Sequence, residues 1–105
     1  MNYSMKLLTK LKAMNDGCSD YRAAQILEIS QQSISKVKNN GTSLSDETLT
    51  RLANLVGENP VIVVAENALE MNYFPNMRQF WEEVLANAKE LESRASAEES
   101  EERAA

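Results

Sequence analysis

The sequence predicts an all-α protein of three parts: a five-helix domain over residues 1–72, an amphipathic helix over residues 73–94, and an acidic, disordered tail over residues 95–105. Three observations predict this organisation. Apolar residues recur at three- and four-residue steps, capping residues or proline precede the apolar segments, and Asp, Asn, Gly or Pro separates them. A chain of 105 residues holds one domain of about 70 residues and an appendage.

The first helix is expected over residues 4–14, and Asp16-Gly17 ends it. Its apolar residues at helical spacing are Met5, Leu7, Leu8, Leu11 and Met14. A short second helix is expected to begin at Ser19 or Asp20, because either side chain can cap the free amides of a first turn.

Capping residues also mark the next three helices. Ser30 precedes residues 31–38, and Gly41 supplies the left-handed residue that ends this third helix. Ser45 caps a fourth helix that ends at Gly57, with Leu44 and Leu49 spaced as a hydrophobic staple. Asn59-Pro60 opens a fifth helix. Its β-branched start leaves an isolated strand over residues 61–64 as the alternative, although no nearby segment supplies a partner strand.

The sixth helix is expected from Met77, and its pattern of large apolar residues at helical steps stops before Arg94. That pattern is Phe80, Trp81, Val84, Leu85, Ala88 and Leu91. Residues 95–105 contain no large apolar side chain, so they bury too little surface to offset the entropy of ordering. We therefore expect this acidic tail to fray or to be disordered.

Composition excludes several classes of protein. The chain has no histidine and a single cysteine, Cys18, so it lacks the commonest general base and metal ligand and has no disulfide framework. No phosphate loop or nucleophile motif accompanies its carboxylates. We expect no enzyme, no cofactor and no metal. Without a long apolar run or a signal-peptide pattern at the N-terminus, we expect a cytoplasmic protein that does not enter the membrane.

The charge is unevenly distributed. Residues 1–43 hold six basic and three acidic residues, a net charge of +3, whereas residues 44–105 hold five basic and thirteen acidic residues, a net charge of −8. The overall charge of −5 therefore conceals a basic first part. Of its lysines, Lys6, Lys10 and Lys12 are interpreted as a solvated helix face. Cys18 is interpreted as a small loop residue, with redox sensing as the alternative.

Residues 20–38 have the pattern of a helix-turn-helix. Ala24 is small where the second helix approaches the first, Glu28-Ile29-Ser30 forms a tight connector, and Ile34 and Val37 are branched residues suited to burial.

Over residues 4–70 the chain resembles the Cro and lambdoid-repressor class of DNA-binding domains, also called XRE-like. Gln31-Gln32-Ser33-Ile34 is similar to the start of the recognition helix in some phage repressors, and Leu49 to Gly57 is similar to the family's Leu-x-x-Leu-Ala-x-x-Leu-Gly helix. The resemblance implies a five-helix lambda-repressor-like fold. The chain departs from the family at Glu28, where Gly is usual, and at Asp20, where Gln is usual.

These residues suggest how DNA would be read. Side chains on the first turns of a helix in the major groove reach base edges, and a Gln amide pairs with adenine N6 and N7. We expect Gln31, Gln32, Ser35 and Lys36 to read bases. Contacts to the DNA backbone are expected from Arg22, Ser33, Lys38, Asn39, Asn40, Thr42 and Ser43. The alternative is that Gln31-Gln32-Ser33 is only a polar, well-capped helix start.

Phe80, Trp81, Val84 and Leu85 either cover the five-helix domain or form a symmetric dimer contact, and we favour dimerisation. A two-fold dimer places two recognition helices about 34 Å apart on one face of the duplex. The expected protein is thus a phage or prophage-type repressor that binds a palindromic operator in double-stranded DNA as a homodimer. One alternative is an antitoxin that represses its own operon. Another is a protein-interaction module whose acidic surface binds another regulator and whose helix-turn-helix is vestigial. The C-terminal segment is a possible site for a protein partner.

Overall fold

A computed structural model describes the backbone of residues 2–104 and the side chains of residues 2–95. Over this range the regular structure is entirely helical, which confirms the predicted all-α class. The helices in chain order are α1 (Tyr3–Met14), α2 (Asp20–Leu27), α3 (Gln31–Asn40), α4 (Asp46–Val56), α5 (Pro60–Met71), a 3₁₀ turn η1 (Pro75–Met77), and α6 (Arg78–Ala104).

Side-chain caps set the starts of α2, α3 and α4 where the sequence predicts them. The hydroxyls of Ser19, Ser30 and Ser45 each accept a hydrogen bond from the backbone N–H three residues later, at 3.1, 3.2 and 3.2 Å. The Asn59 side chain accepts from the Val61 N–H at 2.9 Å and begins α5. Residues 61–64 are therefore helical, and the strand alternative is wrong.

The core lies between the first five helices. At its centre, Leu49, Leu52 and Ala53 of α4 have no exposed surface, and Leu44, which precedes the Ser45 cap, is buried in the same cluster as Leu49. The other buried members of this cluster are Leu7, Leu8, Leu11, Ala23, Ala24, Leu27, Ile34, Val37, Val56 and Val63. Met14, at the end of α1, is 57% exposed, so the predicted apolar face of this helix ends at Leu11.

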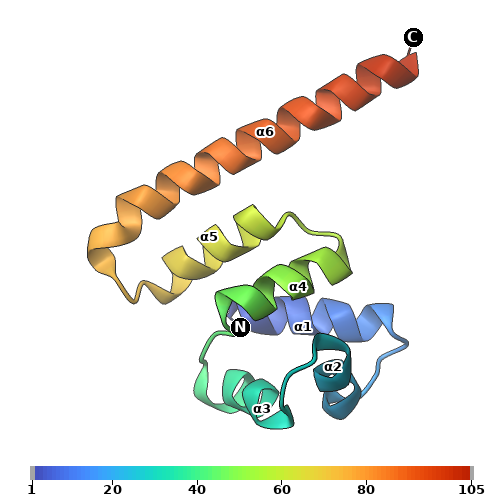
Figure 1. The fold of residues 1–105 in the computed structure, drawn as a ribbon, viewed down its shortest axis with the longest axis vertical. Helices are drawn as coiled ribbons and strands as arrows, with labels where there is room; N and C mark the ends of the chain where they lie inside the picture. The colour runs from blue at the N-terminus through green and yellow to red at the C-terminus, as the bar shows by residue number, and fades with distance from the viewer. Residues whose placement is uncertain (1, 105) are drawn as a thin grey trace.

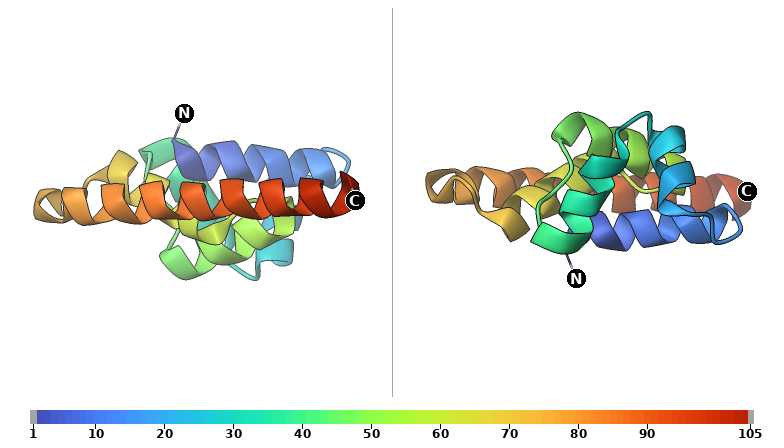
Figure 2. Two further views of the ribbon diagram at one scale, coloured as in Figure 1. Left: turned by 90° about the horizontal axis from the view of Figure 1, so that it is seen from above. Right: turned by 90° about the horizontal axis from the view of Figure 1, so that it is seen from below.

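The helices form layers: α2 and α3 lie at one end of the molecule, α1 and α4 come next, then α5, and α6 lies at the other end (Figure 1). Both α2 and α3 pack against α1, α2 also contacts α4, and α5 packs on the other side of α4. Helix α6 lies across α5 at the opposite end. When the molecule is viewed from below, α3 lies in front and α6 behind (Figure 2). The surface of α3 and the surface of α6 are therefore far apart.

Helix α6 differs from the sequence prediction at its C-terminal end. The backbone continues as a helix through Ala104, so Arg94 does not mark its end. Seven of the ten residues 95–104 are Ala or Glu, which have high helix propensity and favour continuation even without an apolar face. The side chains of the predicted acidic tail lie outside the described residues, except that of Ala95.

Candidate nucleic-acid interface

The two helices α2 and α3 are joined by a connector of three residues, 28–30. Glu28 adopts a left-handed conformation with φ of 59°, and the Ile29 N–H donates to the Ala24 carbonyl at 3.0 Å. This reversal is the αL ending that glycine usually provides, and here a glutamate adopts it. The departure from the family pattern at Glu28 therefore leaves the tight turn in place.

Helix α3 is buried on one face and exposed to solvent on the other. Ile34 and Val37 are each 2% exposed and belong to the core. Ala24 of α2 is 4% exposed, as expected for a small residue at a close helix contact. The opposite face of α3 is polar and contains no acidic residue. Burial of one face thus fixes which side chains α3 presents to solvent.

The structure leaves all four predicted base readers exposed. Gln32, Ser35 and Lys36 line one shallow depression together with Asn39 and Asn40. Gln31 is also exposed but does not line this depression. The arrangement presents amide, hydroxyl and ammonium groups side by side, which are the groups that hydrogen-bond to base edges.

Five of the seven predicted backbone contacts line two small depressions. Asn39 and Asn40 border the predicted readers, whereas Ser33, Thr42 and Ser43 line a second small groove that also includes Lys36. The Ser33 hydroxyl is hydrogen-bonded to that of Ser30 at 3.0 Å, so it contributes to the helix cap.

Arg22 lies on the exposed surface of α2, where its guanidinium donates to the Gln25 side-chain oxygen at 3.3 Å. Both partners belong to the same helix, three residues apart. This contact leaves the charge of Arg22 uncompensated, and the guanidinium keeps further donors for an external anion.

Lys38 is part of an ion-pair cluster that the sequence does not predict. Its ammonium lies 2.6 Å from Asp20 Oδ2, and the Lys12 ammonium lies 2.8 Å from Asp20 Oδ1. The two lysine side chains come from α3 and α1, so Asp20 connects three helices. Hydrogen bonds from Lys12 and then Lys38 hold the pKa of the Asp20 carboxyl below its usual value.

A second ion pair neutralises the acid in the connector. Arg51 of α4 donates to Glu28 at 3.2 Å. Arg51 and Glu28 are 23 residues apart in the sequence, Lys12 and Asp20 are 8 apart, and Lys38 and Asp20 are 18 apart. Neither this pair nor the Asp20 cluster therefore has a local sequence signal. Lys12 was interpreted as part of a solvated face, but its side chain is only 33% exposed and is engaged by Asp20.

The four predicted dimerisation residues divide between two faces of α6. Phe80 is 50% exposed, whereas Trp81, Val84 and Leu85 are half-buried, and the following Ala88 is 7% exposed where α6 packs on α5. The rings of Phe80 and Trp81 meet edge to face, with centroids 5.1 Å apart. Most of this apolar set therefore covers the chain's own α5.

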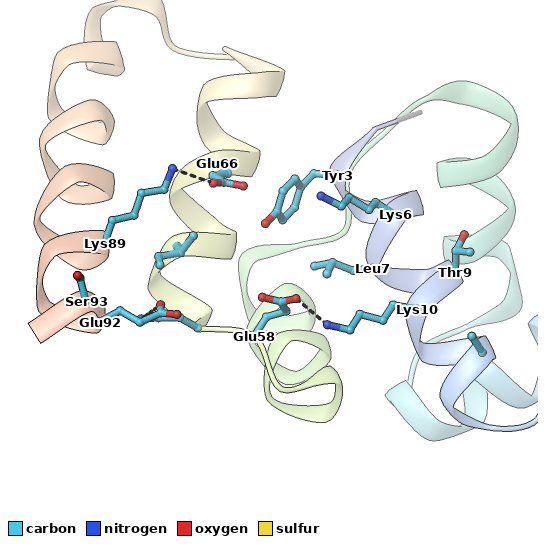
Figure 3. Close-up of a pocket in the computed structure, with 13 residues that line it drawn as sticks. Tyr3, Lys6, Leu7, Thr9, Lys10, Glu58, Glu66, Lys89, Glu92 and Ser93 are labelled. Atoms are coloured by element: carbon cyan, nitrogen blue, oxygen red, sulfur yellow. Dashed lines mark hydrogen bonds and ion pairs between the residues drawn. The ribbon is translucent and has the colours of Figure 1, made fainter. Parts of the chain in front are cut away.

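A groove lies between α1, α5 and α6, and none of the residues that line it belongs to α3 (Figure 3). Four of its charged side chains are paired within the chain: Lys10 with Glu58 at 2.6 Å and Lys89 with Glu66 at 3.5 Å. Lys6 lies over the Tyr3 ring, 5.6 Å from its centroid, and Glu92 accepts a hydrogen bond from Asn59 at 3.2 Å. Tyr3 lines it, and burial together with the Glu66 carboxylate raises the pKa of the Tyr3 phenol well above its usual value. No cluster of potential metal ligands occurs among the described side chains.

In comparisons with known proteins, no family model, no curated protein and no solved structure matches the chain. Among the described helices, none combines the length and apolar character needed to cross a membrane.

Proposed function

We propose that the protein is a sequence-specific DNA-binding regulator that inserts α3 into the major groove of double-stranded DNA. The observation that carries the proposal is the polar face of α3, on which Gln31, Gln32, Ser35 and Lys36 are exposed. The buried Ile34 and Val37 anchor the helix from the other side. A rigidly held helix with free amides and an ammonium on its first turns suits the reading of base edges.

The charge around α3 supports the same proposal. Helix α3 contains Lys36 and Lys38 and no acid, and the two acids that precede it in residues 20–30, Asp20 and Glu28, are paired with Lys38 and Arg51. None of the ion pairs among the described side chains involves Lys36. The order of α1–α5, with a short α2–α3 pair packed on α1 and α4, supports the lambda-repressor-like arrangement that the sequence resemblance implies. The roles of repressor and phage or prophage regulator follow from that resemblance.

The active form proposed is a homodimer joined through apolar side chains of η1 and α6 that packing on α5 leaves partly exposed. Met77 of η1 is 38% exposed, and Phe80 and Leu91 of α6 are 50% and 65% exposed. Met77, Val84 and Leu91 are seven residues apart, and Phe80 is three residues after Met77, which is the spacing of a helix-pairing stripe. Of the four predicted dimerisation residues, this proposed contact keeps the exposed Phe80 and the half-buried Val84. It adds Met77 and Leu91 and leaves out Trp81 and Leu85.

The test of DNA reading begins with selection of bound sequences from a random duplex pool at near-physiological salt. Enrichment of a gapped palindrome is expected, with half-sites about one helical turn apart. Gln31→Ala and Gln32→Ala are each expected to weaken binding to that site by about 1 to 3 kcal/mol while leaving nonspecific binding unchanged. Gln79→Ala, an exposed glutamine on α6, is the matched control and should have no effect.

Two outcomes contradict the proposal. If folded protein enriches no sequence, DNA is not its ligand, and a protein partner at the C-terminal segment becomes the better hypothesis. Equal losses on every duplex would mean that the glutamines do not read bases. For the dimer, sedimentation equilibrium should give a dimer for the native chain and a monomer for Leu91→Glu. Leu55→Glu, which alters an exposed leucine of α4, should remain dimeric.

A further inference from the structure

The C-terminal end of α3 contains the only Asn-Gly pair of the sequence. The chain has three glycines, and they follow Asp16, Asn40 and Val56. Asparagine is among the chemically labile residues. It is most labile before glycine, because a residue without a side chain offers the least hindrance to attack by its own backbone nitrogen on the asparagine carboxamide.

Nothing in the fold covers this pair. Asn40 is the last residue of α3, Gly41 follows it, and both are exposed. A Cβ atom added at Gly41 would meet no other atom within 4 Å. Water and solvent bases therefore reach the Gly41 N–H and the Asn40 carboxamide.

The Gly41 N–H also differs from those of the other two glycines. The Gly17 N–H donates to the Lys12 carbonyl at 2.8 Å, and the Gly57 N–H donates to the Asn54 carbonyl at 3.4 Å. Among the described residues, none accepts a hydrogen bond from the Gly41 N–H. A helix end without this bond frays more readily, which gives the Asn40 side chain freedom to reach the Gly41 nitrogen.

We propose that Asn40 is a site of spontaneous deamidation. The Gly41 backbone nitrogen loses its proton to a solvent base and bonds to Asn40 Cγ, while the bond from Cγ to the carboxamide nitrogen breaks and ammonia leaves. Water then opens the resulting cyclic imide at either of its two carbonyl carbons. The products are an aspartate or an isoaspartate at position 40, so one neutral amide becomes one carboxylate.

The new carboxylate would act on the exposed face of α3. Lys36 is four residues before Asn40, and both line the same shallow depression. Opposite charges at this spacing on a helix attract each other, so an acid at position 40 would neutralise Lys36. An acid at the C-terminus of a helix is also unfavourable for the helix dipole. If the proposed function holds, DNA affinity therefore declines as the protein ages.

The chemical step is tested without DNA. The full chain is incubated at mildly alkaline pH, folded in buffer and unfolded in guanidinium chloride, until the unfolded sample has lost most of its Asn40 carboxamide. Trypsin then releases the peptide of residues 39–51, which lies between Lys38 and Arg51. In the folded sample, tandem mass spectrometry should find the amide-to-acid mass change at Asn40, while the exposed Asn54 and Asn87 keep their amides.

Three variants connect the modification to DNA binding. Asn40→Asp should bind the selected operator about 5- to 150-fold more weakly than the fresh native chain, as for the loss of one base contact. Asn54→Asp, which places the same charge near the end of α4, should bind as the native chain does. Asn40→Gln should keep its initial affinity during incubation, because the longer side chain disfavours ring closure. Circular dichroism verifies that each variant is folded.

Two results would overturn the proposal. The first is a folded chain that keeps the Asn40 carboxamide while the unfolded chain loses it, which would mean that the helix end protects Asn40. The second is equal operator affinity of Asn40→Asp and the fresh native chain, which would remove the consequence for DNA binding. A fresh native chain that binds no duplex would refute the proposed function instead, and the mass measurement would still decide whether Asn40 deamidates.

Discussion

Asp20→Asn is expected to lower the stability of the fold while it strengthens DNA binding. Asp20 connects α1, α2 and α3 through ion pairs with Lys12 and Lys38 at 2.8 and 2.6 Å. Asparagine keeps the shape of the side chain and removes its charge. The substitution therefore tests whether the Asp20 carboxylate stabilises the fold while it weakens DNA binding at the proposed interface.

The loss of stability follows from the exposure of the two pairs. The side chains of Asp20, Lys12 and Lys38 are 29%, 33% and 43% exposed, so each pair contributes about 0.2 to 1 kcal/mol. An acid in the first turn of a helix adds about 0.3 to 1 kcal/mol by interaction with the helix dipole. The free energy of unfolding should fall by about 1 to 2 kcal/mol in urea denaturation followed by Trp81 fluorescence.

This contribution also depends on pH. Because the pKa of Asp20 is lowered in the folded state, its stabilisation is complete above its unfolded pKa of about 3.9. It is lost as the pH falls from there through the lower folded value. The difference between the native chain and Asp20→Asn should therefore disappear in acid.

The gain in DNA binding comes from the release of Lys38. With Asp20 neutral, the ammonium is free to contact a phosphate, and one repulsive charge is removed. The slope of log affinity against log salt should steepen by up to about 0.9 for one added phosphate contact. Fluorescence anisotropy of a labelled duplex at several salt concentrations measures this slope.

Asp46→Asn is the matched control, because Asp46 is also in the first turn of its helix, but none of the ion pairs among the described side chains involves it. It should reproduce only the dipole effect and leave the salt slope unchanged. Equal destabilisation by the two substitutions would refute the bridging role. Weaker DNA binding with a shallower slope in Asp20→Asn would refute the argument that Asp20 withholds Lys38 from phosphate.

Three further predictions concern stability. Glu28→Gly should raise the free energy of unfolding by about 0.5 to 1 kcal/mol in chemical denaturation, because relief of the left-handed strain outweighs an exposed ion pair; a decrease would contradict this. Leu52→Ala should lower the free energy of unfolding by about 2 to 5 kcal/mol, measured by thermal melting. Leu55→Ala, at a position that is 45% exposed on the same helix, should lower it much less, and equal losses would contradict the assignment of Leu52 to the core. Above a pH of about 10 the native chain should lose stability relative to Tyr3→Phe, because the Tyr3 phenol ionises at a lower pH in the unfolded chain than in the folded one. A difference in stability between the two chains that stays constant in alkaline denaturation would contradict the raised pKa.

The helix starts could be predicted because their signals are local. Each of Ser19, Ser30 and Ser45 lies within three residues of the amide that it caps. Likewise, the exposure of Gln31 and Gln32 follows from the burial of Ile34 and Val37 on one short helix. Periodicity and capping therefore predict both the elements and the face of α3.

Contacts between distant segments could not be predicted in this way. Nothing near Asp20 in the sequence indicates Lys12 or Lys38, since their pairing depends on how three helices meet. The apolar residues of α6 cover more than one face, and only packing on α5 separates the inward Trp81 from the outward Phe80. The extension of α6 beyond Arg94 depends on backbone propensity rather than burial, so the apolar pattern does not reveal it.

The length of α6 has a consequence for the geometry of a dimer. At 1.5 Å per residue, its 27 residues span about 40 Å, yet among the described elements it packs only against α5 and η1. Its direction is therefore set by α5, against which Ala88 is buried and Lys89 pairs with Glu66 at 3.5 Å. A rotation of about 10° of α6 on α5, taken about the start of α6, would move the far end by roughly 7 Å, about two base-pair steps of DNA. In the proposed dimer, substitutions at the contact between α5 and α6 would thus change the operator spacing that the dimer accepts.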